Sequence, residues 1–234
     1  MGEDSMKQAL AVVVPCYNAG NKIRPVIEKA LQVLPTIIVV DDGSTDGAPQ
    51  SLHDLPVRVL HLSPNQGKGF AMIAGFREAL TDSAVTCVAI LDADGQHDPA
   101  ELPRLYDVFD SQKADLVIGS RSFDQAHVPL RSRLGNKLTA RLTGILLGQQ
   151  VQDTQSGFRL HSRTFLDYIL SAVPGGRYDT EMEILVRAVR KGYKVAACPI
   201  QTIYETGNPT SHFNKFRDSY RIYKRLLVTS LRRD

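Results

Sequence analysis

The sequence has no long hydrophobic run and little cysteine, and each absence excludes a class of protein. No apolar stretch approaches the roughly 18 to 20 residues that a membrane-spanning helix requires. The three cysteines, Cys16, Cys87 and Cys198, are scattered and odd in number, and the last two lie within apolar segments. We therefore expect reduced, buried thiols rather than a disulfide framework, in a cytoplasmic protein.

Neither positive nor negative charge is in large excess. The formal net charge is only +3, which gives no reason to expect a nucleic-acid partner. The first residues, MGEDSMKQ, are polar and acidic and lack a signal-peptide core, so residues 1–7 are predicted to be a disordered lead-in. The 234 residues, of which 43% are hydrophobic, suffice for one large domain with a substantial core.

An apolar run that ends in paired aspartates organises the chain. Residues 85–91 are rich in β-branched side chains and predict a buried strand, which DADGQ follows at once. Where the strand gives way to a turn, Asp92 and Asp94 can converge on one point, and two unpaired carboxylates there would repel each other. Mg²⁺ or Mn²⁺ would resolve this conflict, because both take carboxylate oxygens together with substrate phosphates. An ordinary acidic turn is the alternative, and the spacing alone does not decide between them.

Strands and helices alternate before this point. Apolar strands are predicted at residues 10–14, 37–40 and 57–62, with helices at 23–34 and 70–80. This alternation is typical of βαβ units in a mostly parallel α/β sheet flanked by helices, in which ligands bind beyond the carboxyl ends of the strands. We therefore expect the active site at that edge, formed by the loops PCYN, DDGSTD, NQGKG and DADGQ.

The second half of the chain is less regular. Helices are predicted at 101–110 and 182–191, and strands at 114–119 and 195–203. Residues 153–159 are predicted to be a polar loop that leads to Leu160. No repeat or linker divides the chain, so one domain is expected.

A set of motifs occurs in a fixed order along the chain: VVVPCYN, VVDDGSTD, NQGKG, LDADGQHDP, GSR and DTQSGFR. The set resembles the family 2 glycosyltransferases of the GT-A fold, and with KGYKVAACPI it looks most like the dolichyl-phosphate-mannose synthase branch. The resemblance covers about residues 8 to 205. It implies an enzyme with a Rossmann-like, mostly parallel sheet that moves a hexose, with inversion, from a UDP- or GDP-linked sugar to a polyprenyl phosphate.

The resemblance also implies residues on the donor side. Tyr17 would stack on the base, Asp42 would accept a hydrogen bond from the base, and Lys68 would offer a positive charge. Asp92, Asp94 and Gln96 would hold Mg²⁺ or Mn²⁺, which acts as a Lewis acid for the departing diphosphate. For His97 we favour a structural or supporting role over that of a metal ligand. The implied nucleotide-binding set is Pro15, Tyr17, Asn18, Asp42, Gly67, Lys68, Asp92 and Arg133.

On the acceptor side, Arg121 and Arg133 would meet the lipid phosphate, because a guanidinium binds phosphate through two donors. A phosphate oxygen is already ionised and needs little help from a general base. If the acceptor is instead a hydroxyl of a glycolipid or polysaccharide, a base is required, and Asp179 or Glu181 is the candidate. Both acids also suit the first turn of a helix, so this alternative stays open, as does a binding module without catalysis. The implied catalytic residues are Asp94, Arg121, Glu181 and Asp179.

Residues 8–212 are thus predicted to be one GT-A domain, and residues 213–234 a basic amphipathic helix. Aromatic and leucine side chains recur in that helix every three or four residues, and basic residues gather on another face. The helix either packs on the domain or a partner subunit, or lies on an anionic membrane surface at the inner face of the membrane. Nucleotide sugar and polyprenyl phosphate are the expected partners, with a homodimer left open.

Overall fold

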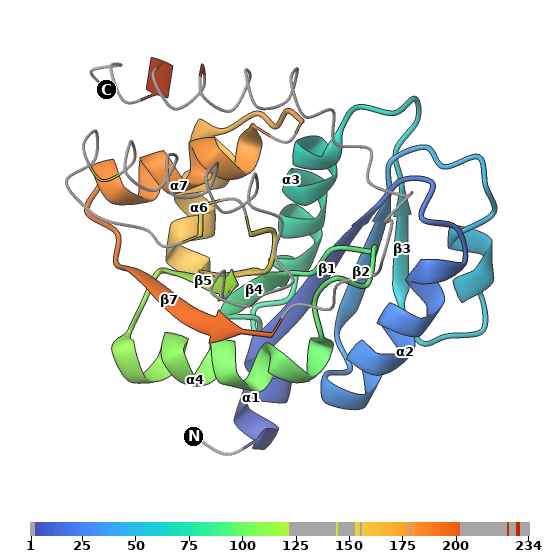
Figure 1. The fold of residues 1–234 in the computed structure, drawn as a ribbon, viewed down its shortest axis with the longest axis horizontal. Coiled ribbons are helices and arrows are strands. Elements are labelled where there is room, and N and C mark those ends of the chain that lie inside the picture. Colours follow the sequence, from blue (N-terminus) through green and yellow to red (C-terminus); the bar gives the residue numbers. More distant parts are fainter. Residues whose placement is uncertain are drawn as a thin grey trace, which may run out of the picture.

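The structure is a computed structural model, and it describes residues 3–121, 144, 153–154, 156–177, 179–201, 224 and 228–229. Its strands are β1 (Leu10–Cys16), β2 (Ile37–Asp41), β3 (Arg58–His61), β4 (Cys87–Ile90), β5 (Leu116–Arg121), β6 (Arg159–Ser162) and β7 (Val195–Ile200). Its α-helices are α1 (Glu3–Ala9), α2 (Ile23–Val33), α3 (Lys68–Ala79), α4 (Leu102–Gln112), α6 (Arg163–Ala172) and α7 (Thr180–Arg190). The strands form one seven-stranded sheet in the order β3-β2-β1-β4-β6-β5-β7 (Figure 1).

The sheet is mostly parallel, as predicted. β1 pairs in parallel with β2 and β4, β2 with β3, and β5 with β7, whereas β6 runs antiparallel to both of its neighbours. Every residue of β1, β2 and β4 is buried, which is why these strands are apolar throughout rather than alternating.

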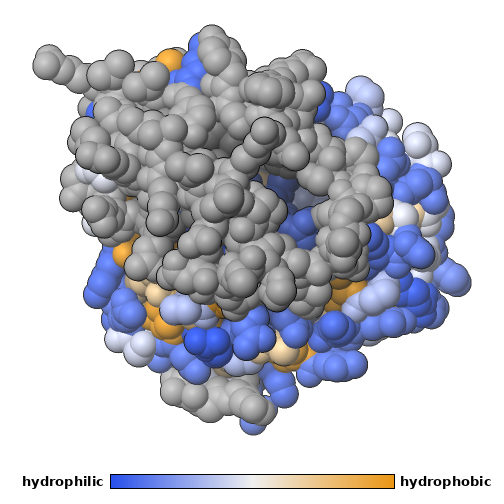
Figure 2. All heavy atoms as spheres, in the orientation of Figure 1, coloured by the Kyte–Doolittle hydropathy of each residue, from blue (hydrophilic) through white to orange (hydrophobic). Residues whose placement is uncertain are grey.

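Helices cover both faces of the sheet and enclose two hydrophobic cores. Val12 and Val14 point into the core beneath α2 and α4, while Val13 points into the core beneath α3, α6 and α7, since successive side chains of a strand face opposite ways. α3 passes very close to β1, because a Cβ on Gly75 would lie 2.3 Å from Cγ1 of Val13. On the face shown in Figure 2, the described surface is mostly hydrophilic.

β6 and α6 differ from the sequence prediction, which had only a polar loop here. β6 reads RLHS and contains Arg159 and His161, both fully buried, so it lacks the apolar pattern that marks the other strands. α6 begins directly after it, where the hydroxyl of Ser162 accepts a hydrogen bond from the backbone N–H of Phe165.

The sequence also led to predictions for the two ends of the chain, which the structure describes in part. The structure has α1 where a disordered lead-in over residues 1–7 was expected, because Met6 is buried in the core and ties the segment down. The predicted helix at 213–234 lies almost wholly outside the described residues. Thr229 within it is buried, and its carbonyl accepts a hydrogen bond from Arg190 of α7. No helix in the described ranges is both long and apolar enough to cross a bilayer.

Candidate active site

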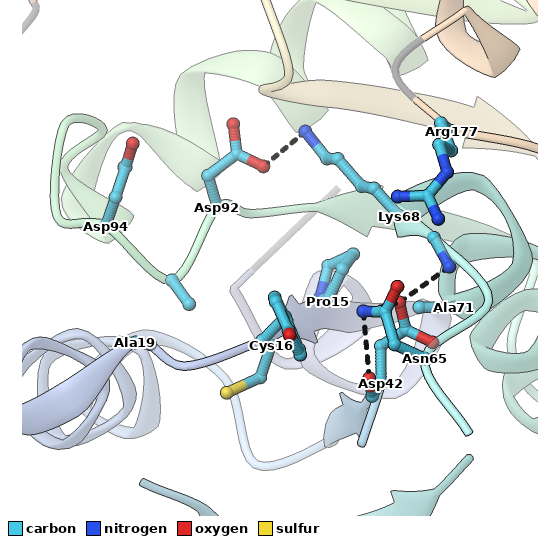
Figure 3. Close-up of a pocket in the computed structure, with 13 residues that line it drawn as sticks. Pro15, Cys16, Ala19, Asp42, Asn65, Lys68, Ala71, Asp92, Asp94 and Arg177 are labelled. Atoms are coloured by element: carbon cyan, nitrogen blue, oxygen red, sulfur yellow. Dashed lines mark hydrogen bonds and ion pairs between the residues drawn. The ribbon is translucent and has the colours of Figure 1, made fainter. Parts of the chain in front are cut away.

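A pocket of about 210 Å³ opens at the carboxyl ends of β1, β2 and β4, the edge where the sequence predicted the site (Figure 3). The loops after these strands, the start of α3 and the loop between α6 and α7 form its walls. Its lining residues are Pro15, Cys16, Tyr17, Ala19, Asp42, Asn65, Gly67, Lys68, Ala71, Asp92, Ala93, Asp94 and Arg177.

The carboxylate of Asp42 organises the loop that precedes α3. Its Oδ2 accepts hydrogen bonds from the Gly67 amide at 2.7 Å and from Nδ2 of Asn65 at 2.9 Å, and its Oδ1 accepts one from the Gln66 amide at 2.8 Å. Gly67 has a φ of +116°, a backbone conformation that side-chain-bearing residues rarely adopt. Asp42 therefore fixes the wall of the pocket, besides the contact with the base that the resemblance implies.

The loops after β1 and β2 are braced against each other. The side-chain oxygen of Asn18 accepts a 2.8 Å hydrogen bond from the amide of Thr45, and the amide of Asn18 donates to the hydroxyl of Ser44 at 3.0 Å. Oδ2 of Asp46 accepts a 2.6 Å hydrogen bond from the amide of Gly20. Asn18, which was predicted to line the nucleotide pocket, lies beside the lining residues and joins the two loops.

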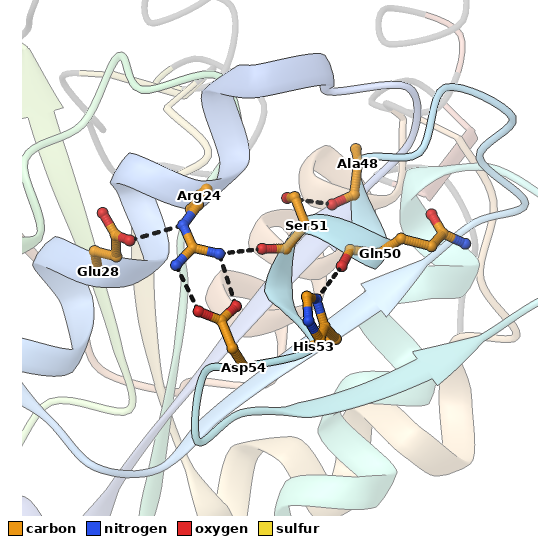
Figure 4. A network of polar contacts seen from close by, with 7 residues as sticks. All are labelled: Arg24, Glu28, Ala48, Gln50, Ser51, His53 and Asp54. Atoms are coloured by element: carbon orange, nitrogen blue, oxygen red, sulfur yellow. Dashed lines mark hydrogen bonds and ion pairs between the residues drawn. The ribbon is translucent and has the colours of Figure 1, made fainter.

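A second brace lies outside the pocket (Figure 4). Arg24 of α2 donates to both carboxylate oxygens of Asp54, at 2.7 and 2.8 Å, and to Glu28 at 2.8 Å. It also donates to the carbonyl of Ser51. These contacts connect α2 to the 3₁₀ turn Pro49–Leu52, which follows the DDGSTD loop.

Lys68 links two carboxylates at the centre of the site. Its Nζ lies 2.6 Å from Oδ1 of Asp92 and 3.1 Å from Oε1 of Glu181. Burial alone would lower the pKa of Lys68, but the charges of Asp92 and Glu181 outweigh it and the pKa is raised. Burial would likewise raise the pKa of Asp92, yet Lys68 lowers it. Lys68 and Asp92 are therefore both charged.

Among the residues that the structure describes, Asp94 has no such cationic partner. Its Oδ1 accepts one hydrogen bond, from the backbone N–H of Gln96 at 3.0 Å. Burial, and then the neighbouring charge of Asp92, raise the pKa of Asp94 above its usual value. Hard carboxylate oxygens with surplus negative charge fit a divalent cation such as Mg²⁺ or Mn²⁺. In the described ranges, no three His, Cys, Asp or Glu side chains cluster closely enough to hold a metal without further ligands.

His97 lies behind these aspartates. It is 3% exposed and stacks on Phe158 with 5.3 Å between ring centroids. Neither of its ring nitrogens has a hydrogen-bond partner among the described residues, and burial lowers its pKa to about 4. A neutral, packed imidazole agrees with the structural role favoured from the sequence.

The SGFR segment, which leads into β6, lies against the site beside Asp92. A Cβ on Gly157 would lie 2.3 Å from Oδ2 of Asp92, so only glycine fits beside the Lys68–Asp92 pair. The buried guanidinium of Arg159 donates to the carbonyls of Ser156 and Thr154, both at 2.8 Å. This clamp holds the segment against the pocket.

The remaining predicted residues lie around this core. Arg121 donates through Nε and Nη2 to the two carboxylate oxygens of Asp153, at 2.7 and 3.0 Å, beside the same segment. Glu181 is occupied by Lys68, and Asp179 accepts a hydrogen bond from the amide of Arg177 at 3.3 Å. Arg133, predicted to bind phosphate, lies outside the described residues.

The Glycosyl transferase family 2 model matches residues 11–170. The chain belongs to this family. The match covers the pocket loops from the end of β1 through the SGFR segment, and the protein is therefore a glycosyltransferase.

Two relatives show the branch of the family. Polyprenol monophosphomannose synthase of Mycolicibacterium smegmatis is 34% identical over 205 residues, which cover 82% of this chain and 77% of the relative. Undecaprenyl-phosphate mannosyltransferase of Micrococcus luteus is 30% identical over 199 residues, which cover 80% of this chain and 81% of the relative. Both agree with the branch that the motifs predicted.

The fold has counterparts among solved structures. Glucosyl-3-phosphoglycerate synthase from Mycobacterium tuberculosis, solved in complex with Mn²⁺, UDP and glucosyl-3-phosphoglycerate, matches with a TM-score of 0.74 at 18% identity. The match covers 99% of this chain and 84% of that chain. It confirms the predicted GT-A fold of the glycosyltransferase.

Among the lining residues with an amide or charged side chain, the sequence prediction missed Asn65 and Arg177 of this glycosyltransferase. Asn65 stands in the NQGKG motif that the prediction quoted, so the motif was found and the residue was not singled out. Arg177 follows two glycines between predicted elements, and no local pattern distinguishes it from a surface arginine. Gln96, predicted as a metal ligand, is not among the lining residues, although its amide contacts Asp94.

Proposed function

We propose that this glycosyltransferase is metal-dependent and transfers a hexose, with inversion, from a UDP- or GDP-linked sugar to a polyprenyl phosphate. The observation behind the proposal is the unequal charge compensation of the two aspartates: Lys68 neutralises Asp92, while the half-buried Asp94 beside it forms no ion pair with any residue that the structure describes. A divalent cation bound with a diphosphate would supply the missing positive charge.

The residues of the donor site have distinct tasks in this proposal. Asp92 and Asp94 hold Mg²⁺ or Mn²⁺, with Gln96 as the further predicted ligand, and Tyr17 offers its 38% exposed ring to the base. The bound metal supplies Lewis-acid stabilisation of the negative charge on the departing nucleoside diphosphate. Lys68 pairs with the ionised Asp92 and competes with the metal for this carboxylate.

The proposed acceptor class follows from the interactions that the acidic side chains around the pocket already make. A hydroxyl acceptor needs a general base, but the carboxylate of Glu181 is paired with Lys68, and the carboxylate of Asp179 accepts a hydrogen bond from the amide of Arg177. An ionised phosphate needs no base. The two relatives named above are a polyprenol monophosphomannose synthase and an undecaprenyl-phosphate mannosyltransferase, which supports the same acceptor class.

The donor is tested first by thermal stabilisation. UDP- and GDP-sugars are added to the protein with and without Mn²⁺, and one donor class is expected to raise the Tm only with the metal. Asp94→Asn should abolish this shift. Asp107→Asn, which removes an exposed carboxylate of α4, should retain it. Stabilisation that is equal with and without metal would contradict metal dependence.

The stabilising donor is then used in a transfer assay. Radiolabelled sugar is expected to pass to polyprenyl phosphate and not to the corresponding polyprenol. Transfer to a glycolipid hydroxyl would instead establish the alternative acceptor class. The predicted peripheral membrane contact of residues 213–234 belongs to this proposal, and co-sedimentation with anionic vesicles, with and without those residues, tests it.

A further inference from the structure

Among the described residues, two cationic side chains with different surroundings line the pocket, Lys68 and Arg177. Lys68 is 2.6 Å from Asp92 and 3.1 Å from Glu181, so its charge is already compensated within the protein. In the part of the chain that the structure describes, the guanidinium of Arg177 is paired with no carboxylate and donates no hydrogen bond. Arg177 is thus a cation of the pocket wall without a protein partner there.

The position of Arg177 is fixed by its backbone. Its amide donates to Oδ1 of Asp179 at 3.3 Å, and its carbonyl accepts a hydrogen bond from the amide of Thr180 at 3.3 Å. The carbonyl of the preceding Gly176 accepts a hydrogen bond from the amide of Phe70 in α3, also at 3.3 Å. The residue therefore sits in a turn that is anchored to both α7 and α3.

The direction of the Arg177 side chain also depends on Gly67, which has no side chain. A Cβ on Gly67 would lie only 2.7 Å from Cγ of Arg177, so the aliphatic stem of the arginine crosses directly over the glycine. This packing aims the guanidinium toward the pocket, on the side where Lys68 enters (Figure 3). Asp92 and Asp94 lie on the other side of Lys68 in the same view.

The charges around the pocket indicate what this guanidinium binds. A nucleoside diphosphate carries negative charge on two adjacent phosphates, and the aspartates can meet it only through a cation. A guanidinium meets phosphate oxygens directly, through a planar set of donors that allows two parallel hydrogen bonds. Because Lys68 is occupied by Asp92 and Glu181, Arg177 is the direct phosphate donor that this wall offers.

We propose that Arg177 binds the diphosphate of the sugar nucleotide and stabilises its charge as it leaves. The inference rests on the proposed function and names a further residue for the same site. In the transfer, the bond between the anomeric carbon and the diphosphate oxygen breaks, and its electron pair stays on that oxygen. The ionised acceptor phosphate forms the new bond to the anomeric carbon, so no proton moves, and Arg177 remains a hydrogen-bond donor throughout.

The test compares diphosphate binding with nucleoside binding. Dissociation constants of UDP and GDP are measured by calorimetry with Mn²⁺, and those of uridine and guanosine by saturation-transfer NMR. Arg177→Gln keeps Cγ over Gly67 and replaces the guanidinium with a neutral amide, while Arg177→Ala removes the stem as well. Arg104→Ala, an exposed arginine of α4 away from the pocket, is the matched control, and thermal melting verifies that each variant is folded.

We expect both Arg177 variants to weaken binding of the cognate diphosphate by about 10- to 100-fold and to leave nucleoside binding unchanged. Arg177→Lys should recover only part of the loss, since an ammonium lacks the planar set of donors. An unchanged diphosphate dissociation constant in Arg177→Gln would overturn the inference and leave the proposed function intact. If the wild-type protein binds neither UDP nor GDP, both the inference and the proposed function fail.

Discussion

The buried guanidinium of Arg159 donates a 2.7 Å hydrogen bond from Nη1 to the backbone carbonyl of Glu181, which joins β6 to the first turn of α7. The same guanidinium binds the carbonyls of Thr154 and Ser156. Arg159 thus fixes the positions of the SGFR segment and of Glu181. Because Glu181 is paired with Lys68, Arg159 also fixes the position of Lys68.

Arg159→Met should therefore lower both stability and donor binding. Three carbonyls lose their donor at a buried site, and we expect the free energy of unfolding to fall by about 3–5 kcal/mol in urea titrations. Arg163→Met is the matched control, because Arg163 also donates to three carbonyls, of Leu80, Asp82 and Val85, but is only half-buried. Arg163→Met should lower the free energy of unfolding by less than Arg159→Met, and it should retain nucleotide binding. Equal losses in the two variants would contradict the role of Arg159.

Asp42→Ala should destabilise the protein even without nucleotide. Two backbone amides and the side chain of Asn65 lose their acceptor, and we expect a loss of about 2–4 kcal/mol in the free energy of unfolding. Asp107→Ala should change it little. If the ligand-free stability of Asp42→Ala equals that of the wild type, the carboxylate serves only the ligand, as the resemblance alone would imply.

Lys68→Met should raise the Mn²⁺ affinity of the nucleotide-free protein, by roughly tenfold. Removing a positive charge 2.6 Å from Asp92 leaves that carboxylate uncompensated, and a cation then binds it with less competition. Calorimetric titration with Mn²⁺ measures the change. Lys113→Met, an exposed lysine paired with Asp110, should leave the affinity unchanged. A lower affinity in Lys68→Met would show that Lys68 supports the metal site rather than competing for it.

His161 should make stability depend on pH. Burial lowers its pKa from 6.5 to about 3, so the folded protein holds the imidazole neutral. This contribution to stability is full above pH 6.5 and is lost as the pH falls toward 3. Between pH 7 and pH 5, the unfolding free energy of the wild type should drop on the order of 2 kcal/mol more than that of His161→Phe. His53→Gln, at an exposed histidine, should keep the wild-type pH dependence; equal slopes for His161→Phe and the wild type would refute the assignment.

The first half of the fold was predictable because its strands are apolar and its loops carry marked motifs. The strands predicted at 10–14, 37–40 and 57–62 are β1, β2 and β3, and the aspartate pair follows β4 as expected. Parallel strands buried on both faces leave a clear signal in hydrophobicity, and their ligand-binding edge follows from their direction.

The parts that were missed depend on contacts between residues far apart in the sequence. In β6, Arg159 and His161 are buried because they have partners far away in the sequence, the carbonyls of Glu181 in α7 and of Val88 in β4, and no local sequence pattern predicts such buried polar side chains. Arg177 reaches the pocket only because Gly67, 110 positions earlier, makes room for its stem. The pairing of Lys68 with Glu181 is equally long-range.

The Arg121–Asp153 pair has a consequence for how this enzyme can change. The amide and guanidinium of Arg121 both bind Asp153, so the chain leaves the sheet after β5 and returns before β6 at one place. The residues that flank the interval 122–152 are therefore held together, and the entropy of joining two fixed ends by a chain segment depends only weakly on the length of that segment. A change in the length or sequence of the interval between two such fixed ends leaves the spacing of β5 and β6 intact.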